Sequence, residues 1–295
     1  MPNPAHKHHY IPIFYTKRWA GPDGLVQRYT KHQAVVERRV HPSRVGWQER
    51  LYELPLVADE HAQVLEERFF RQLDNVAAVA LQKMSCEPML HLEAHETTAW
   101  SIFMLSLLHR TPSYLADTKA AGQRLWSGQL MKEVRERYLE LRTVHDPATF
   151  EQYMDQRDPM QTDQHTLSNL PHLLSNPRIC QVLNNMPWGQ FTVPVGERTL
   201  LLSDNPLARS NGLLNDGGHL AMPLSPRRLL IVAPRRETMQ SFDRVPIRQL
   251  VRAMNQWTVS SARHFVVATD RLQDSFIKKH FGSEPKPSLH QNIDW

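Results

Sequence analysis

The spacing of apolar residues predicts long helices in the middle of the chain. Between residues 60 and 84 apolar side chains recur at intervals of three and four, on one stripe of a helix: Leu65, Phe69, Leu73, Val76, Ala80 and Met84. A second helix is predicted over residues 92–109, and its half from Ala99 to Leu108 is apolar on nearly every side, which is typical of a buried helix. Thr111-Pro112 interrupts this pattern, and a more charged helix is predicted over residues 114–141.

Short strands are predicted toward both ends of the chain, where runs of β-branched and other apolar residues are bounded by Gly, Pro and charged residues. These strands cover residues 25–29, 35–38, 51–54, 191–195, 199–202, 220–222, 229–232 and 265–268. A helix is predicted over residues 247–259, after Val245-Pro246, and a short helix is predicted after Asp270.

Together these elements predict a predominantly helical α+β fold, with central helices packed on a small mixed β-sheet built from the N- and C-terminal segments. Neither an internal repeat nor a clear linker divides the sequence. We therefore predict a single domain over residues 1–295. It contains an irregular and β N-terminal part (1–58), a helical middle (59–187), a mixed β/α part (188–281) and a loose tail (282–295).

The overall charge is mildly positive, at +5 with the histidines neutral. The basic residues form scattered pairs, which are typical of solvated surface: Lys17-Arg18, Arg38-Arg39, Arg227-Arg228 and Arg235-Arg236. This balance permits a nucleic acid or another phosphate-bearing partner without indicating one. No apolar run reaches the roughly 18–20 residues that cross a bilayer, so we expect no membrane partner. Two distant cysteines, Cys86 and Cys180, form no disulfide framework, which favours a cytoplasmic protein.

Four polar segments lie at the ends of apolar elements, where a rigid backbone can direct a side chain into a cleft. The first contains His8 and His9, directly before a short helix that Pro12 is expected to begin. A neutral imidazole can ligate a metal or act as a general base near neutral pH. The alternative is that both histidines hydrogen-bond to the backbone. Adjacent residues of an extended chain point in different directions, so the two rarely bind one ion.

The second segment is Glu66 on the first long helix. At 100° per residue, Glu66 lies about 50° from the centre of the apolar stripe, whereas Glu67 lies nearly opposite and is expected at the surface. A lone buried carboxylate is costly, so Glu66 should either be paired in the interior or face a site. A structural salt bridge and a functional role both remain open.

The third and fourth segments are Arg110-Thr111-Pro112 and Ser203-Asp204-Asn205-Pro206. Arg110 ends the most buried helix, where a cation complements the helix dipole. Alternatively, its guanidinium fork holds a carboxylate, either Glu66 or Asp204, or a ligand phosphate. Asp204 and Asn205 follow a predicted strand. They either form a turn with their own backbone or offer oxygen and amide groups to a hydrolytic or metal site.

Other chemical signals are weaker. His91 and His95 lie four residues apart on one helical face, but the glutamate of the zincin pattern, which directly follows the first histidine, is at the wrong position. The chain contains no G-x-G-x-x-G, P-loop, G-x-S-x-G or EF-hand pattern, so nucleotide-dependent and serine-hydrolase functions lose their usual support.

The sequence resembles an uncharacterised, mainly bacterial family known as domain of unknown function 4238. The resemblance is carried by motifs in the expected order along the chain: His8-His9-Tyr10-Ile11-Pro12 with Phe14-Tyr15 and Trp19, Leu65-Glu66, Arg110-Thr111-Pro112, Ser203 to Pro206, Pro223-Leu224-Ser225-Pro226, and Asn255. One departure is Ile13, where many members carry a polar residue, often Gln. The resemblance implies a shared fold and brings no assigned activity.

Three hypotheses follow for the function. In the first, the protein is a metal-assisted hydrolase of a phosphodiester-type substrate, with His8 or His9 as base and Arg110 and Asn205 steadying an anionic group. A divalent metal would then be the cofactor, held by His9, Glu66 and Asp204. In the second, the same residues form a non-catalytic module that binds a ligand, a nucleic acid or a protein. In the third, the polar cluster is purely structural. The sequence leaves open whether the protein is an enzyme.

Overall fold

The computed structural model describes residues 6–86, 89–127, 129–158, 160–210, 212–213, 215 and 217–283. The fold is α+β and predominantly helical, as predicted, with about 49% helix and 16% strand. The chain forms two compact units. We call them the small unit (Met1–His8, Glu49–Gln72 and Pro112–Leu174) and the large unit (His9–Gln48, Leu73–Thr111 and Ser175–Trp295). The single domain stays a prediction, and residues 284–295 of the predicted tail lie outside the described residues.

The small unit is built mainly from short helices. They are α2 (Asp59–Ala62), the π-helix (Leu65–Phe70), α5 (Pro112–Ser127), α6 (Gln129–Glu136), α7 (Tyr138–Leu141), α8 (Phe150–Gln156), α9 (Met160–Ser168) and α10 (Leu170–Leu174). A salt bridge of 3.3 Å joins Lys119 on α5 to Asp163 on α9. Near α6 and α8, Met131, Tyr138 and Phe150 form a small apolar cluster.

The long helix predicted over residues 60–84 is not uniform. The π-helix Leu65–Phe70 follows α2 and continues directly into α3 (Arg71–Met84). A π turn closes its hydrogen bonds over five residues instead of four and therefore changes the direction of the side chains around it. Apolar spacing alone does not reveal such a turn, because it assumes a constant 100° per residue.

The first sheet of the large unit combines the two ends of the chain. Its strand order is β3 (Val35–Val40), β2 (Val26–Lys31), β10 (Phe265–Ala268) and β6 (Leu202–Ser203). In the antiparallel pair of β2 and β10, Phe265 lies opposite Thr30 and Ala268 lies opposite Gln27. The sequence correctly predicted a sheet made from N- and C-terminal segments.

The second sheet has the order β5 (Trp188–Thr192), β9 (Arg228–Val232), β8 (Leu220–Ser225) and β7 (Ala208–Arg209). All pairs in both four-stranded sheets are antiparallel, whereas a mixed sheet was predicted. Short connections such as the turn between β8 and β9 produce antiparallel neighbours, because a parallel pair needs a long crossover. Two further strands, β1 (Lys7–His9) and β4 (Trp47–Glu49), pair with each other.

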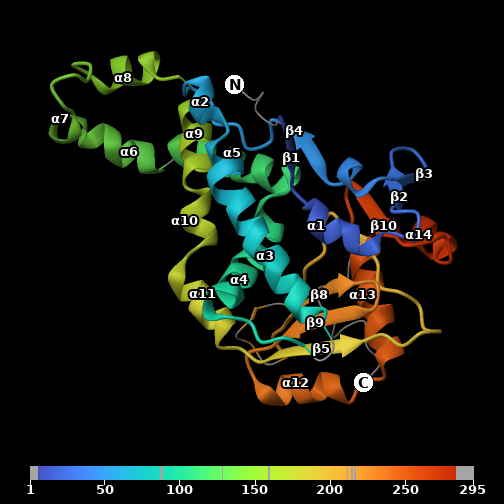
Figure 1. Ribbon diagram of the computed structural model, residues 1–295. Coiled ribbons are helices and arrows are strands. Elements are labelled where there is room, and N and C mark those ends of the chain that lie inside the picture. Colours follow the sequence, from blue (N-terminus) through green and yellow to red (C-terminus); the bar gives the residue numbers. More distant parts are fainter. Residues whose placement is uncertain are drawn as a thin grey trace. The chain divides into compact units, whose positions relative to one another are not determined.

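The main core of the large unit lies between the second sheet and α13 (Ile247–Ser260). Figure 1 shows α12 (Arg236–Asp243) and α13 near β5, β9 and β8. Leu250, Met254 and Trp257 of α13 pack in one apolar cluster with Leu229 and Ile231 of β9. The apolar spacing of residues 247–259 predicted this helix almost to the residue, because one of its faces is buried.

The remaining helices of the large unit include α4 (Ala94–His109), α11 (Pro177–Asn184) and α14 (Asp274–His280). Asn184 links α11 to α4, since its carboxamide accepts from Ser101 Oγ at 2.7 Å and donates to Thr98 Oγ1 at 2.8 Å. In the described part of the chain, every helix is too short or too polar to cross a membrane.

The strand predicted over residues 51–54 is wrong. Arg50 has a φ of 53°, which is rare outside glycine and turns the chain at the end of β4. Glu53 then donates its backbone N–H to the carbonyl of Arg50 at 3.2 Å, so this apolar run forms a turn. Leu51 and Leu54 are nevertheless buried, which explains why their pattern resembled a strand.

The N-terminal motif anchors a short helical segment, α1 (Ile13–Thr16) and the 3₁₀ turn η1 (Lys17–Trp19), inside the large unit. Tyr15 and Trp19 are fully buried and meet edge to face, with their ring centroids 5.4 Å apart. The Tyr15 hydroxyl donates to the carbonyl of Pro223 at 2.5 Å, and Trp19 Nε1 donates to the carbonyl of Leu200 at 2.8 Å. These bonds fix α1 against the β8 strand and the segment before β6.

Gly46 permits a close contact with the same motif, and this contact gives a test of the fold. Its φ is +65°, and an added Cβ would lie 2.7 Å from Ile11 Cβ. Gly24 has a similar φ of +73° but open space around its Cβ position. Both alanine variants bear the strain of positive φ, about 1–2 kcal/mol, and Gly46→Ala adds a steric clash of about 1–3 kcal/mol. We expect Gly46→Ala to lower the free energy of unfolding, measured in urea, by more than Gly24→Ala; equal losses would contradict the packing of Gly46 on Ile11.

Candidate functional site

His8 is buried in the small unit, and both of its ring nitrogens are used there. The backbone N–H of Tyr52 donates to His8 Nδ1 at 2.9 Å. His8 Nε2 must therefore carry the proton, and it donates to Gln63 Oε1 at 2.5 Å. A neutral imidazole in this arrangement has no lone pair left for a metal or a substrate proton. The geometry thus agrees with the structural alternative for His8.

His9 lies half-buried in the large unit, on the other side of the division that passes through β1. Its Nε2 lies 3.2 Å from the carbonyl oxygen of Ser43. A carbonyl only accepts, so His9 Nε2 is the donor and cannot ligate a metal in this state.

Glu66 lies in the π-helix of the small unit and is half-buried, whereas Glu67 is exposed. The angular prediction for these two neighbours is therefore confirmed. One carboxylate oxygen of Glu66, Oε2, is inaccessible to solvent. This oxygen therefore faces protein rather than bulk water.

Arg110 is fully buried at the end of α4, and its guanidinium is held by two groups of the large unit. Nη1 donates to Asp74 Oδ1 at 3.0 Å, and Nε donates to the backbone carbonyl of Tyr10 at 2.8 Å. The predicted fork on a carboxylate is thus present, with Asp74 of α3 as a carboxylate partner that the sequence did not indicate. Burial raises the pKa of Asp74, and the Arg110 charge partly opposes that shift.

Asp204 is 2% exposed and holds a turn that lies far away in sequence. Its carboxylate accepts the backbone N–H groups of Arg263, His264 and Phe265 at 3.1 to 3.2 Å. Burial raises the pKa of Asp204, and these backbone donors counteract part of that effect. The carboxylate therefore caps the entry to β10 rather than its own turn.

Asn205 is the predicted site residue that reaches an open hollow. Its backbone N–H donates to Ser203 Oγ at 3.2 Å, as in the predicted turn. The residue lines a surface hollow of about 290 Å³ together with Ser260, Ser261 and Arg263. This hollow lies beside the Asp204 cap, but the Asp204 side chain does not line it.

Tyr10 brings three of the predicted segments together in the large unit. Its carbonyl binds Arg110, and its ring lies 6.4 Å from the ring of His264 and 6.3 Å from that of Phe265, next to the Asp204 cap. Burial and the nearby Asp204 raise the pKa of the Tyr10 hydroxyl, while Arg28 opposes the shift. The segments around His9, Arg110 and Asp204 thus meet in the interior, and Tyr10 itself is 5% exposed.

The predicted metal site gains no support from this geometry. Among residues 6–86, 89–127, 129–158, 160–210, 212–213, 215 and 217–283, no group of three or more His, Cys, Asp or Glu side chains could hold a metal ion. Of the three predicted ligands, Asp204 already accepts three backbone N–H groups. The residues present therefore do not fit a divalent ion at this place.

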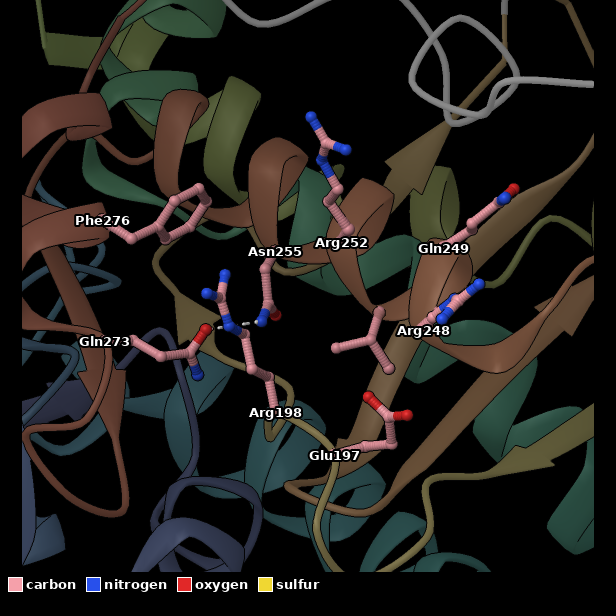
Figure 2. Close-up of a pocket in the computed structure, with 9 residues that line it drawn as sticks. Glu197, Arg198, Arg248, Gln249, Arg252, Asn255, Gln273 and Phe276 are labelled. Carbon is pink, nitrogen blue, oxygen red and sulfur yellow. Dashed lines mark hydrogen bonds between the residues drawn. The ribbon is translucent and has the colours of Figure 1, made fainter.

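A different cavity of about 340 Å³, which we call the α13 cavity, opens in the large unit. It is lined by Glu197, Arg198, Arg248, Gln249, Val251, Arg252, Asn255, Gln273 and Phe276. In Figure 2, Glu197 and Arg198 come from the loop before Thr199, Arg248 and Arg252 come from α13, and Phe276 and Gln273 lie at one side. Three arginines and one carboxylate give this cavity a positive lining.

The floor of the α13 cavity is held rigidly by two carboxamides. Asn255 Nδ2 donates to the Thr199 carbonyl at 2.8 Å and to Gln273 Oε1 at 3.1 Å, and Asn255 Oδ1 accepts the Leu201 N–H at 2.9 Å. Gln273 Nε2 also donates to the Thr199 carbonyl, at 2.9 Å. These bonds fix the backbone directly after Arg198, so they position the Arg198 side chain at the cavity (Figure 2).

Part of this cavity had a signal in the sequence. Arg248, Val251, Arg252 and Asn255 follow the spacing i, i+3, i+4, i+7 and share one face of α13. In the sequence, Asn255 was identified only as one of the motifs that carry the family resemblance. Arg198 has no local signal, because it reaches the cavity through the fold of a loop.

Comparisons with known proteins give one family and no individual relatives. A family described as "Protein of unknown function (DUF4238)" matches residues 7–271. Neither the curated proteins nor the solved structures contain a match to the chain.

The structural role of Asp204 can be tested by removing its carboxylate. Asp204→Ala leaves three backbone N–H groups without their acceptor, and we expect a loss of about 2–4 kcal/mol in the free energy of unfolding. Asp270→Ala is the control, because half-buried Asp270 accepts one backbone N–H in the described part of the chain, that of Leu272 at 2.9 Å. The free energy of unfolding of Asp270→Ala should fall by less than about 1 kcal/mol. Equal losses in urea denaturation would show that Asp204 does not hold the turn.

Proposed function

Because the chain belongs to the DUF4238 family, whose description assigns no activity, we propose a function from its own geometry: it is a binding module for a phosphate-bearing ligand, which it holds in the α13 cavity. The single observation that carries this proposal is that Arg198, Arg248 and Arg252 line one cavity (Figure 2). Arginine presents a planar fork of donors that matches phosphate oxygens, and it remains charged at any physiological pH.

The three guanidinium groups are not neutralised by the described part of the chain. None of them forms a salt bridge with a described carboxylate, although Glu197 lines the same cavity. All three residues are exposed, whereas the Asn255 and Gln273 floor beneath them is buried. The cavity therefore combines positive charge that is available to a ligand with a rigidly held floor.

The position of Arg248 and Arg252 on α13 adds an electrostatic argument. The two residues are four apart on one helical face, where like charges destabilise a helix by about 0.2–0.5 kcal/mol. Arg248 also lies in the first turn, close to the positive end of the helix dipole, and no acidic residue offsets it there. A bound anion would relieve both repulsions, so the site favours an anionic occupant.

The size and apolar part of the cavity limit the ligand. A volume of about 340 Å³ is at the small end of ligand pockets, which span about 300–1,000 Å³. Val251 and the half-buried ring of Phe276 add apolar surface beside the arginines. A phosphate group attached to a small organic moiety satisfies both parts of the lining.

The metal-assisted hydrolase stays a prediction with less support than the binding module. Its residues are buried or engaged by backbone groups, as described for His8, Arg110 and Asp204. We further propose that the protein works in a reducing cytoplasm. Both cysteines are free thiols, which agrees with such a compartment.

Arginine removal tests the ligand site directly. We expect Arg248→Ala and Arg252→Ala each to weaken pyrophosphate binding by about tenfold or more, because each removes a charge-assisted interaction of about 1.5–3 kcal/mol. Isothermal titration calorimetry measures the change. Arg244→Ala is the matched control, since exposed Arg244 precedes α13 and does not line the cavity. The proposal fails if wild type does not bind pyrophosphate, or if all three variants bind it equally.

The same charges make a second prediction for the ligand-free protein. Arg248→Gln removes the repulsion with Arg252 and with the helix dipole, so it should raise the free energy of unfolding by about 0.2–0.5 kcal/mol. The variant should also gain less thermal stability than wild type when pyrophosphate is added. Thermal unfolding with and without pyrophosphate checks both effects. A ligand-free variant less stable than wild type would show that Arg248 has a structural role instead.

A further inference from the structure

A second basic cavity lies near α1 in the large unit. We call it the α1 cavity, and its volume is about 690 Å³. The lining consists of Phe14, Lys17, Arg18, Ala78, Leu81, Gln82, Ser225, Pro226 and Arg227. Three of these side chains are cationic and none is acidic. Phe14, Leu81 and Pro226 supply apolar surface between the charges.

Two basic pairs that were expected to be separate solvated surface meet at this cavity. Lys17-Arg18 comes from η1, Arg227 comes from the turn between β8 and β9, and Arg228, which does not line the cavity, begins β9. Partial desolvation of the otherwise exposed Arg18 lowers the pKa of its guanidinium, and the nearby charge of Arg228 lowers it further. Lys17, Arg18 and Arg227 form no salt bridge with a described carboxylate. The positive charge gathered here is therefore available to an anion.

Arg227 connects the α1 cavity to the α13 cavity. Its Nη1 donates to the backbone carbonyls of Pro194 and Glu197, at 2.7 Å each. Glu197 and the adjacent Arg198 line the α13 cavity. The loop of residues 193–199 is thus bonded to Arg227 of the α1 cavity and lines the α13 cavity with Glu197 and Arg198.

Each cavity also offers one half-buried phenylalanine beside its cations. Phe14 of the α1 cavity packs on Phe103, with ring centroids 5.4 Å apart, and Phe276 of the α13 cavity packs on His280 at 5.0 Å. The neighbouring rings restrict the motion of both phenylalanines. Cations that follow a phosphate backbone, together with aromatic rings that stack on bases, are the means by which proteins bind single strands without sequence preference.

We propose that the phosphate-bearing ligand is a single-stranded nucleic acid whose backbone passes from the α13 cavity across the 193–199 loop to the α1 cavity. This inference rests on the proposed function, because it takes the α13 cavity as the first phosphate site. Phosphates contact Arg198, Arg248 and Arg252 at one end and Lys17 and Arg18 at the other. Bases stack on Phe276 and Phe14.

Fluorescence anisotropy with labelled oligothymidylates of about 4 to 12 nucleotides tests the inference. Affinity should rise with length until both cavities are occupied, and it should fall steeply with salt because several phosphate contacts release counterions. A Lys17→Ala/Arg18→Ala double variant should bind the longest oligothymidylate about tenfold more weakly than wild type. The same variant should bind pyrophosphate as wild type does, because the α13 cavity is intact.

Arg244→Ala serves as the control and should leave both ligands unaffected. Thermal unfolding of the double variant checks that the fold persists, which is expected because Lys17 and Arg18 are exposed. The inference is overturned if the affinity is independent of oligonucleotide length, or if the double variant binds the longest strand as tightly as wild type does. Pyrophosphate binding by the same proteins would then show that the proposed α13 site still stands. Equal affinity for a duplex of the same length would also overturn the inference, since paired bases cannot stack on the two phenylalanines.

Discussion

The Asn255 carboxamide imposes the constraint on which both cavities depend. It accepts the N–H of Leu201 and donates to the carbonyl of Thr199, and Gln273 binds the same carbonyl. The intervening Leu200 carbonyl accepts from the indole of Trp19. The backbone of residues 199–201 is thus held by side chains from α13, from the segment before α14 and from the N-terminal motif. The loop that precedes them carries Arg198 of the α13 cavity and accepts hydrogen bonds from Arg227 of the α1 cavity, so its position follows from these bonds.

This arrangement separates two classes of polar residue. Arg110 and Asp204 are buried in the large unit, and their hydrogen-bonding groups meet backbone or carboxylate partners. Their energetic role is to satisfy one another and the backbone, because a buried polar group without a partner is costly. Arg248 and Arg252 differ, since they remain exposed and repel each other. Residue types alone do not distinguish these classes, whereas burial and hydrogen-bond partners do.

The sequence predicted the elements that bury one face along their whole length. Residues 265–268 form β10 as predicted, and α4 and α13 end within two residues of their predicted limits, because their apolar patterns agree with their surroundings. The π-helix was missed because it departs from the assumed helical period. The strand predicted over residues 51–54 was wrong because the positive φ of Arg50 makes a turn, and arginine is not a residue type that indicates such a turn.

The candidate site was less accessible to sequence reasoning. Arg110 was expected to hold a carboxylate, but Asp74 could be identified only once α3 and α4 were packed together. Asp204 was expected either in a turn with its own backbone or in a hydrolytic or metal site, yet it caps residues 263–265, about sixty positions later in the chain. The arginines of α13 share a helical face that the sequence does show, whereas Arg198 and the meeting of the two basic pairs depend on tertiary structure.

The pairing of β2 with β10 has a consequence for biosynthesis. The strand at Val26–Lys31 is translated more than 200 residues before its partner at Phe265–Ala268. At about 5–20 residues per second, β2 can pair with the neighbouring β3 early, but the edge that β10 later covers stays open to other chains for on the order of tens of seconds. In this interval chaperones would have to shield the open edge of β2.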